Sequence, residues 1–323
     1  MDGQPSALPP RPPGAVKAIL SGFNVVAGNI GIILLPVTLD VFLWLGPRLT
    51  LSKLFAPVLK LIQETQASAG QAQALSQSVQ DVANGFNMFS NLRTFPLGVF
   101  SLMLFNLSPN SPFGPRVNLE ITNWFLAAGI QILLVATGCF LGSLYFYLVA
   151  RVALQPKKGP GLWRALFHSL LLAGVCQIVI LMVLPLALVF QLLSDNFLGI
   201  VLFLLLAWPL TWLGLMIFFS SHAVFTDSKN AFAALGQTFR MLRYGMPPTG
   251  WFAVTALIIS RCMDFLWLSA PAESWMTLVG ILGHAFISTG LLAASFIFYR
   301  DLSLWVEEAL QWLNTHQITS ARA

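Results

Sequence analysis

The sequence predicts an all-α fold: a polytopic integral membrane bundle of about six transmembrane helices with additional interfacial helices. Hydrophobic residues make up 57% of the 323 residues and charged residues only 9%, whereas an ordinary soluble domain carries about 25% charged residues. The hydrophobic residues form runs of roughly 20, the length a helix needs to cross a bilayer. The 17 Lys and Arg residues stand singly or in pairs between these runs. They are typical of topology signals, and they argue against a nucleic-acid partner.

The chain begins with a proline-rich segment and a first apolar run. Five prolines among the first 13 residues predict a disordered cytoplasmic tail over 1–18, with no helix before about Gly14 and no removable signal peptide. The first transmembrane helix is expected over 19–46. This run is longer than the hydrocarbon thickness of about 30 Å requires, so a tilt or kink is needed, and Pro36 is the expected kink site.

Residues 47–118 are predicted to form an external helical cap. Apolar residues at helical spacing predict an amphipathic helix over 50–62, and a weaker 4-3-4-3 pattern predicts a second helix over 71–89. The apolar run 95–107 has only thirteen residues, too few for a crossing, so we expect a re-entrant or interfacial segment. Prolines and glycines in 108–116 predict a loop.

The remainder, 119–300, is predicted to be a five-helix transmembrane region that includes a cytoplasmic interfacial helix over 227–244. An amphipathic cytoplasmic tail, 301–323, should continue from the last span. The span that contains Arg261 and Asp264 has the weakest signal, because both charges lie within it. The five expected spans are 121–150, 165–193, 197–219, 251–270 and 276–299.

The Lys and Arg residues also predict the orientation. With six spans, eleven of them lie on the side of both termini and five on the other side. Because basic residues collect in the cytoplasm, both termini are expected there. If 95–107 crossed the membrane, the loop with Lys157 and Lys158 would face outward, which is the main reason to deny this segment a span.

Charged residues inside the apolar runs are the first candidate functional site. Arg261 and Asp264 are three residues apart and share a helix face, and a charge at that depth costs about 2.5–3.5 kcal/mol unless it is paired. They could line a pathway for an ion, a proton or a polar headgroup. Alternatively they form a structural pair, with Asp40 of the first span as a third member, that fixes how the helices dock.

The predicted helix 227–244 is the second candidate site. Asp227 or Ser228 could cap its N-terminus. Its expected apolar stripe consists of Phe232, Leu235, Phe239 and Leu242. The basic residues Lys229, Arg240 and Arg243 are expected to contact anionic lipid headgroups or a partner protein.

Two further patterns concern helix packing. Gly138-xxx-Gly142 and Gly290-xxx-Ala294 allow close helix approach, and we expect packing within the bundle rather than a dimer interface. Pro185 and Pro209 fall inside predicted spans, where a proline either kinks the helix or marks a broken helix beside a substrate site.

No catalytic or cofactor-binding motif stands out. Cys139, Cys176 and Cys262 lie in apolar runs without metal-ligand spacing. The four histidines are dispersed, and no phosphate-binding loop or nucleophile motif follows a strand. We therefore expect no catalytic residues, no metal, no cofactor and no enzymatic activity.

One part of the chain resembles a known family. The segment AVFTDSKNAFAALGQTFRMLRYGMPPTGWF from Ala223, with the later FIFYRDLSLWVEE, is similar to a superfamily of bacterial six-span proteins whose members include the membrane domain joined to some glycerophosphodiester phosphodiesterases. The resemblance covers 120–310 and implies a similar fold in the bacterial inner membrane. The phosphodiesterase domain itself is missing, so hydrolysis is not implied. The matching residues are Ala234, Leu235, Thr238, Arg243, Tyr299, Arg300, Asp301 and Leu302.

Together these observations predict a non-enzymatic structural or accessory membrane protein that binds lipids or a membrane partner. The alternative is a permease for a small polar or lipid-derived solute, with Arg261, Asp264 and Asp40 in its path. The two hypotheses differ in what they require at Arg261, since a permease needs a hydrated cavity there whereas a scaffold can be packed tightly.

Overall fold

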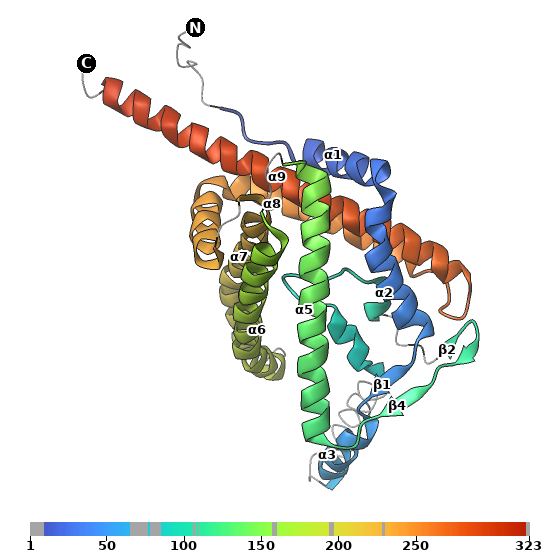
Figure 1. The fold of residues 1–323 in the computed structure, drawn as a ribbon. Helices are drawn as coiled ribbons and strands as arrows, with labels where there is room; N and C mark the ends of the chain where they lie inside the picture. The colour runs from blue at the N-terminus through green and yellow to red at the C-terminus, as the bar shows by residue number, and fades with distance from the viewer. Residues whose placement is uncertain are drawn as a thin grey trace.

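The computed structural model is an all-α bundle (Figure 1) and describes residues 10–64, 77, 85–105, 108, 110–156, 160–193, 197–227 and 230–320. Long helices follow one another along the chain with short connections, except between α3 and α5. The α-helices are α1 (Ala15–Gly28), α2 (Leu34–Leu45), α3 (Ser52–Glu64), α5 (Trp124–Leu154), α6 (Leu162–Leu193), α7 (Phe197–Asp227), α8 (Ala231–Trp267) and α9 (Met276–Ser320).

Within the described residues, five helices are long and apolar enough to cross a membrane, and the bent pair α1–α2 raises the number to six. They correspond to the six predicted spans. The helices α6 and α7 continue through Pro185 and Pro209, so neither is interrupted there. At 45 residues, α9 is about 68 Å long, and it therefore extends far beyond a hydrocarbon core of about 30 Å.

The bend in the first span is not where the sequence predicted it. The chain turns by 97° between α1 and α2, through the 3-10 helix η1 (Ile30–Ile33). Pro36 lies in the first turn of α2, where a backbone N–H has no partner within the helix, so a proline is tolerated without a kink. The prediction of a kink at Pro36 was wrong.

The N-terminal tail is shorter than the predicted 1–18. The helix α1 already begins at Ala15, so residues 15–18 are helical. The carbonyl of Pro10 accepts a hydrogen bond of 2.9 Å from Trp305 Nε1 on α9, which holds the extended residues 10–14 against that helix. Residues 1–9 lie outside the described part of the chain.

The predicted interfacial helix 227–244 and the span that follows it form one helix, α8, which is kinked at Gly245. Asp227 belongs to the end of α7, and the N-cap residue of α8 is Asn230. Of the predicted apolar stripe, Phe232 is 74% exposed and Phe239 46% exposed, whereas Leu242 is fully buried. Small side chains let α8 pack closely, and the buried residues of this part of α8 are Ala231, Ala234, Thr238, Met241, Leu242 and Gly245.

The predicted external cap is only partly helical. The helix α3 is present near its predicted position. Two short strands, β1 (Arg48–Thr50) and β4 (Asn118–Glu120), pair in parallel. The loop predicted over 108–116 contains a hairpin of β2 (Asn110–Ser111) and β3 (Gly114–Pro115). The helix predicted over 71–89 falls mostly outside the described residues; its last residues begin the 3-10 helix η2 (Met88–Leu92).

The end of α2 and two predicted outer connections, 47–118 and the one between the last two spans, meet at one end of the bundle. Trp44 Nε1 donates a hydrogen bond of 2.7 Å to the carbonyl of Ala272, and Asn110 Nδ2 donates one of 2.8 Å to Glu273 Oε1. The ring of Trp275 packs edge-on against those of Trp44 and Phe113. Residues 10–14 and the C-terminal end of α9 lie away from this contact, on the side where α1 crosses α9 (Figure 1).

Candidate functional site

Asp40 is fully buried and binds the main chain of the segment between η2 and β2. Its carboxylate accepts hydrogen bonds from Ser101 Oγ, from Leu102 N at 3.0 Å and from Met103 N at 3.5 Å. Leu102 and Met103 begin the 3-10 helix η3 (Leu102–Phe105), whose first N–H groups have no partner within the helix. Asp40 therefore caps a short helix that lies deep among the other helices.

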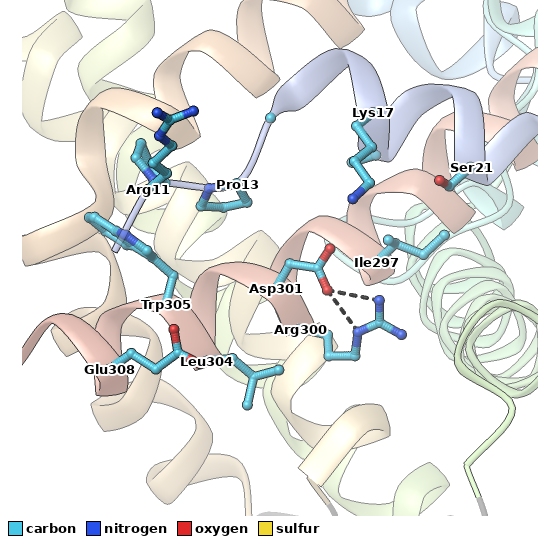
Figure 2. A pocket seen from close by; sticks show the side chains of 13 residues that line it. Arg11, Pro13, Lys17, Ser21, Ile297, Arg300, Asp301, Leu304, Trp305 and Glu308 are labelled. Atoms are coloured by element: carbon cyan, nitrogen blue, oxygen red, sulfur yellow. Dashed lines mark hydrogen bonds and ion pairs between the residues drawn. The ribbon is translucent and has the colours of Figure 1, made fainter. Parts of the chain in front are cut away.

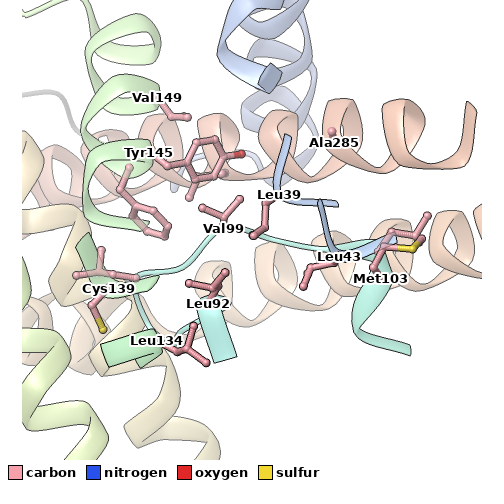
Figure 3. Close-up of a cluster of buried hydrophobic side chains, with 14 of the residues drawn as sticks. Leu39, Leu43, Leu92, Val99, Met103, Leu134, Cys139, Tyr145, Val149 and Ala285 are labelled. Atoms are coloured by element: carbon pink, nitrogen blue, oxygen red, sulfur yellow. The ribbon is translucent and has the colours of Figure 1, made fainter. Parts of the chain in front are cut away.

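The same segment packs against the middle of α5. A Cβ atom at Gly138 would lie 2.4 Å from the Leu92 carbonyl oxygen, and one at Gly142 would lie 2.6 Å from Gly98 N. Only glycine permits this approach. Leu92 and Val99 of the segment pack beside Cys139 and Tyr145 in the hydrophobic core (Figure 3). Most of residues 92–103 are therefore part of the core, with backbone that is mostly not helical, whereas Phe95 is 45% exposed.

Asp264 pairs with a residue of the next helix. His284 Nδ1 on α9 lies 2.8 Å from Asp264 Oδ1, and the two side chains are 9% and 16% exposed. Because the carboxylate oxygen accepts, Nδ1 carries the proton. The Asp264–His284 contact joins α8 to α9 near their connection.

Arg93 brings the predicted intramembrane charges into one neighbourhood. Its guanidinium interacts electrostatically with Asp40, Asp264 and Arg261, and Asp40 is also within electrostatic reach of His284. The three predicted residues thus lie within electrostatic reach of Arg93, although Arg261 itself is exposed. We call this group of residues the polar cluster. Its members are Asp40, Arg93, Arg261, Asp264 and His284.

The sequence analysis missed Arg93 and His284. Arg93 precedes the short apolar run 95–107, so it resembles an ordinary loop cation. His284 stands alone in an apolar run, and nothing in its spacing links it to a carboxylate 20 residues earlier. Only the antiparallel packing of α8 on α9 reveals that pair.

A second buried histidine connects α7 to α9. His222 Nδ1 lies 3.0 Å from the Phe218 carbonyl oxygen, and Nε2 lies 2.7 Å from Ser295 Oγ. A carbonyl can only accept, so the proton is on Nδ1. The Ser295 hydroxyl that faces Nε2 also lies 2.7 Å from the Leu292 carbonyl oxygen. Aromatic rings from Phe146, Phe218 and Phe296 surround the imidazole. This buried contact satisfies both ring nitrogens and is structural.

A cavity of about 800 Å³ lies where residues 11–14, α1 and α9 meet, and we call it the end cavity. Lys17 extends from α1 toward Asp301, and Trp305 lies beneath Arg11 (Figure 2). Asp301 is already paired with Arg300, whose Nη2 lies 2.8 Å from the carboxylate. The side chains of Arg11, Lys17 and Glu308 also line this cavity.

The predicted lipid-contact residues stand apart from the polar cluster. Lys229 lies outside the described residues. Arg240 and Arg243 are exposed on the N-terminal part of α8. Arg240 lines a small cavity of about 50 Å³ together with Glu307, and the Arg243 guanidinium carbon lies 5.8 Å from the centre of the Tyr244 ring.

One cation of the cap has a clear structural role. Arg116 Nη1 donates a hydrogen bond of 2.6 Å to the carbonyl of Leu43 at the C-terminal end of α2, where a positive charge is favourable. Burial lowers the pKa of Arg116 to about 10, so the guanidinium is still charged at neutral pH.

The fold and the buried charges together define an all-α bundle of the multi-pass membrane type. Comparisons with protein-family models, curated proteins and solved structures find no match for the chain. The resemblance to the phosphodiesterase-linked membrane domain therefore stays a prediction. Among the described residues, no three His, Cys, Asp or Glu side chains are placed to hold a metal ion.

Proposed function

We propose that the protein is a non-enzymatic accessory or structural membrane protein that holds an anionic lipid headgroup in the end cavity. The observation that carries this proposal is the position of Lys17, which faces the Arg300–Asp301 pair across the cavity. Since Arg300 already neutralises Asp301, Glu308 is the one acidic side chain that opposes Arg11 and Lys17 among the described lining residues. The lining has an excess of positive charge where an anionic headgroup would lie.

The surroundings of the cavity support a membrane interface. Trp305 is amphipathic, as side chains at the headgroup level commonly are. Other basic residues belong to the same predicted side of the membrane, among them Arg151, Arg164, Arg240 and Arg243. We infer from this excess of basic residues that the termini are cytoplasmic and, with the family resemblance, that the membrane is the bacterial inner membrane.

Lipid retention by the full chain tests the proposal. The protein is purified in mild detergent after exposure to vesicles of phosphatidylglycerol and phosphatidylcholine, and bound lipids are measured by native mass spectrometry. We expect phosphatidylglycerol to be retained preferentially. The double variant Arg11→Gln, Lys17→Gln should lower its retention about tenfold or more, because each basic side chain near a membrane surface contributes about 1 kcal/mol.

Arg151→Gln is the matched control, because it removes an exposed basic residue that does not line the end cavity. It should leave phosphatidylglycerol retention unchanged. Equal losses in the double variant and in the control would show that general surface charge, rather than this cavity, attracts the lipid. Equal retention of the two lipids by the unmodified protein would also overturn the proposal.

A permease is the second candidate, favoured by the five titratable or charged residues of the polar cluster. Against it, Asp40 is occupied by three donors and Asp264 by His284. The variant Arg261→Leu, Asp264→Leu separates the two, with proton flux into proteoliposomes as the readout. A folded variant that loses a flux seen in the unmodified protein would favour the permease.

A further inference from the structure

A cavity of about 270 Å³ lies between α7, α8 and α9, with Phe100 of the core segment at its wall; we call it the α8–α9 groove. Phe219, Phe252 and Leu292 make its lining mostly apolar, and three serines, Ser260, Ser288 and Ser295, add hydroxyl groups. It shares no lining residue with the end cavity. The groove is therefore a separate candidate site.

The groove leads toward the polar cluster. On α8 its lining residues Ala253, Ala256, Leu257 and Ser260 share one helix face, and the next position on that face is Asp264. On α9 the lining includes Ser288, which is one turn after His284. Because Asp264 and His284 contact each other, the end of the groove at Ser260 and Ser288 lies next to this pair. The other end lies at Phe252 and Ser295, and the Ser295 hydroxyl is 2.7 Å from His222 Nε2.

The polar end has hydrogen-bonding capacity that the described residues do not use. The Arg93 guanidinium makes no hydrogen bond or ion pair with the described residues, although it interacts electrostatically with Asp264. Arg93 and His284 lie behind the groove lining rather than in it. His284 is only 7% exposed, and its Nε2 is buried without a hydrogen-bond partner among the described residues. Asp40, in contrast, is fully occupied by main-chain and serine donors.

The geometry points to a binding site for a single alkyl chain with a carboxyl head, the class of a free fatty acid. The chain would lie in the groove, and the carboxyl would lie at Ser260 and Ser288 toward Arg93 and His284. Arg93 supplies N–H donors for a carboxylate. His284 Nε2 fits both forms of the head, because it can accept from a carboxylic acid or, when protonated, donate to a carboxylate.

The size of the groove favours one chain over a complete phospholipid. Its volume is slightly below the range of about 300–1,000 Å³ typical of small-molecule sites. Phe252 and Ser260 are eight residues apart on α8, which corresponds to about 12 Å along the helix axis. This length holds the carboxyl-proximal part of one chain, and the rest can extend into the surrounding hydrocarbon.

Photolabelling of the full chain tests this inference. The protein is placed in phosphatidylcholine nanodiscs with a palmitic acid analogue that carries a diazirine near the carboxyl end, and labelled peptides are mapped by mass spectrometry. We expect labels on the groove-lining parts of α7, α8 and α9. Unlabelled palmitic acid should compete at least fivefold better than hexadecyltrimethylammonium, whose cationic head Arg93 would repel.

Two substitutions of the same helix form a matched pair. Ala256→Phe fills the groove and should reduce labelling at least fivefold. Ile258→Phe adds a ring at a position that is 56% exposed and outside the lining, so labelling should be unchanged. Arg93→Gln should weaken competition by palmitic acid but not by hexadecanol, which carries no charge.

Three results would overturn the inference. Labels spread evenly over lipid-facing helix surfaces of the unmodified protein would show that no groove site exists, whatever the variants do. Equal competition by the acid and by the cationic amphiphile would refute the assigned head. Unchanged labelling in Ala256→Phe would place the chain elsewhere. None of these results depends on phosphatidylglycerol retention by the end cavity.

Discussion

The two small-residue motifs of this protein have the same sequence form but pack against different kinds of segment, one irregular and one helical. Gly138 and Gly142 on α5 face the non-helical backbone of residues 92–98. Gly290 and Ala294 on α9 face the helix α1 instead, where a Cβ atom added to Gly22 would lie 2.4 Å from the Gly290 carbonyl oxygen and 2.5 Å from Ala294 N. Both motifs pack within the chain, as expected.

The two packed segments differ in whether their backbone hydrogen bonds are satisfied within the segment itself. The helix α1 satisfies its own backbone hydrogen bonds, so contact with α9 requires only close packing. Residues 92–103 cannot do so, and buried N–H and C=O groups that find no partner are costly. Asp40 supplies acceptors for this segment, and Gln177 Nε2 donates a hydrogen bond of 3.1 Å to the Phe95 carbonyl. The small-residue motif of α5 therefore packs against irregular backbone whose free N–H and C=O groups are bound by polar side chains of other helices.

The largest effect is expected from Asp40→Leu. This change removes the acceptor for Ser101, Leu102 N and Met103 N, and each unsatisfied buried group costs about 1–3 kcal/mol. We expect a loss of at least about 3 kcal/mol in the free energy of unfolding, measured by denaturant unfolding in mild detergent. Asp301→Asn, at a half-exposed ion pair, should change stability by less than about 1 kcal/mol. Similar small losses in both variants would show that Asp40 does not support the segment.

Next in size is Gly142→Ala. Its Cβ atom would collide with backbone atoms of Leu97 and Gly98, and such overpacking costs about 1–3 kcal/mol. Gly129→Ala is the control on the same helix, because a Cβ atom there has nothing within 4 Å. It should be neutral or stabilising by up to about 1 kcal/mol. The stability of both variants is measured by thermal unfolding. Equal stability of the two would mean that residues 92–98 do not pack against Gly142.

A smaller effect that can be rescued is expected from Gly290→Ala. The added Cβ atom would lie 2.3 Å from Phe23 Cδ1, a side-chain atom that can move. We expect a loss of about 1–2 kcal/mol, part of which Phe23→Leu should restore in the double variant. No trimming of a side chain can relieve the backbone collision of Gly142→Ala. If the stability effects of Gly290→Ala and Phe23→Leu were simply additive in a double-mutant cycle, the α1–α9 contact would be contradicted.

The smallest effect is expected from Trp305→Phe. The ring still packs, but the hydrogen bond to the Pro10 carbonyl is lost, at a cost of about 0.5–1.5 kcal/mol. Hydrogen exchange should accelerate in the first turn of α1, just after the segment that Trp305 holds, while exchange at 92–98 stays unchanged. Faster exchange in both segments would show that the two docking sites are coupled.

Much of the fold could be predicted because a helix in a membrane is a local structure. Its hydrogen bonds are internal, so the length and composition of an apolar run suffice to predict it. The six expected spans follow from this. The helix near 50–62 follows from its apolar spacing, and the late start of the first helix follows from the prolines before it. The bend at η1 could not be predicted in the same way, because Pro36 is harmless in the first turn of α2 and the bend comes before it.

For the candidate site, the sequence by itself determined that Asp40, Arg261 and Asp264 are costly charges in need of partners, because the price of a charge in hydrocarbon is independent of the fold. Which partners they find was decided by tertiary structure alone. Asp40 caps η3, His284 reaches Asp264 across the α8–α9 hairpin, and Arg93 enters from a segment too short to cross. These contacts join residues 20 to 171 positions apart along the chain, and spacing within one helix cannot encode such distances.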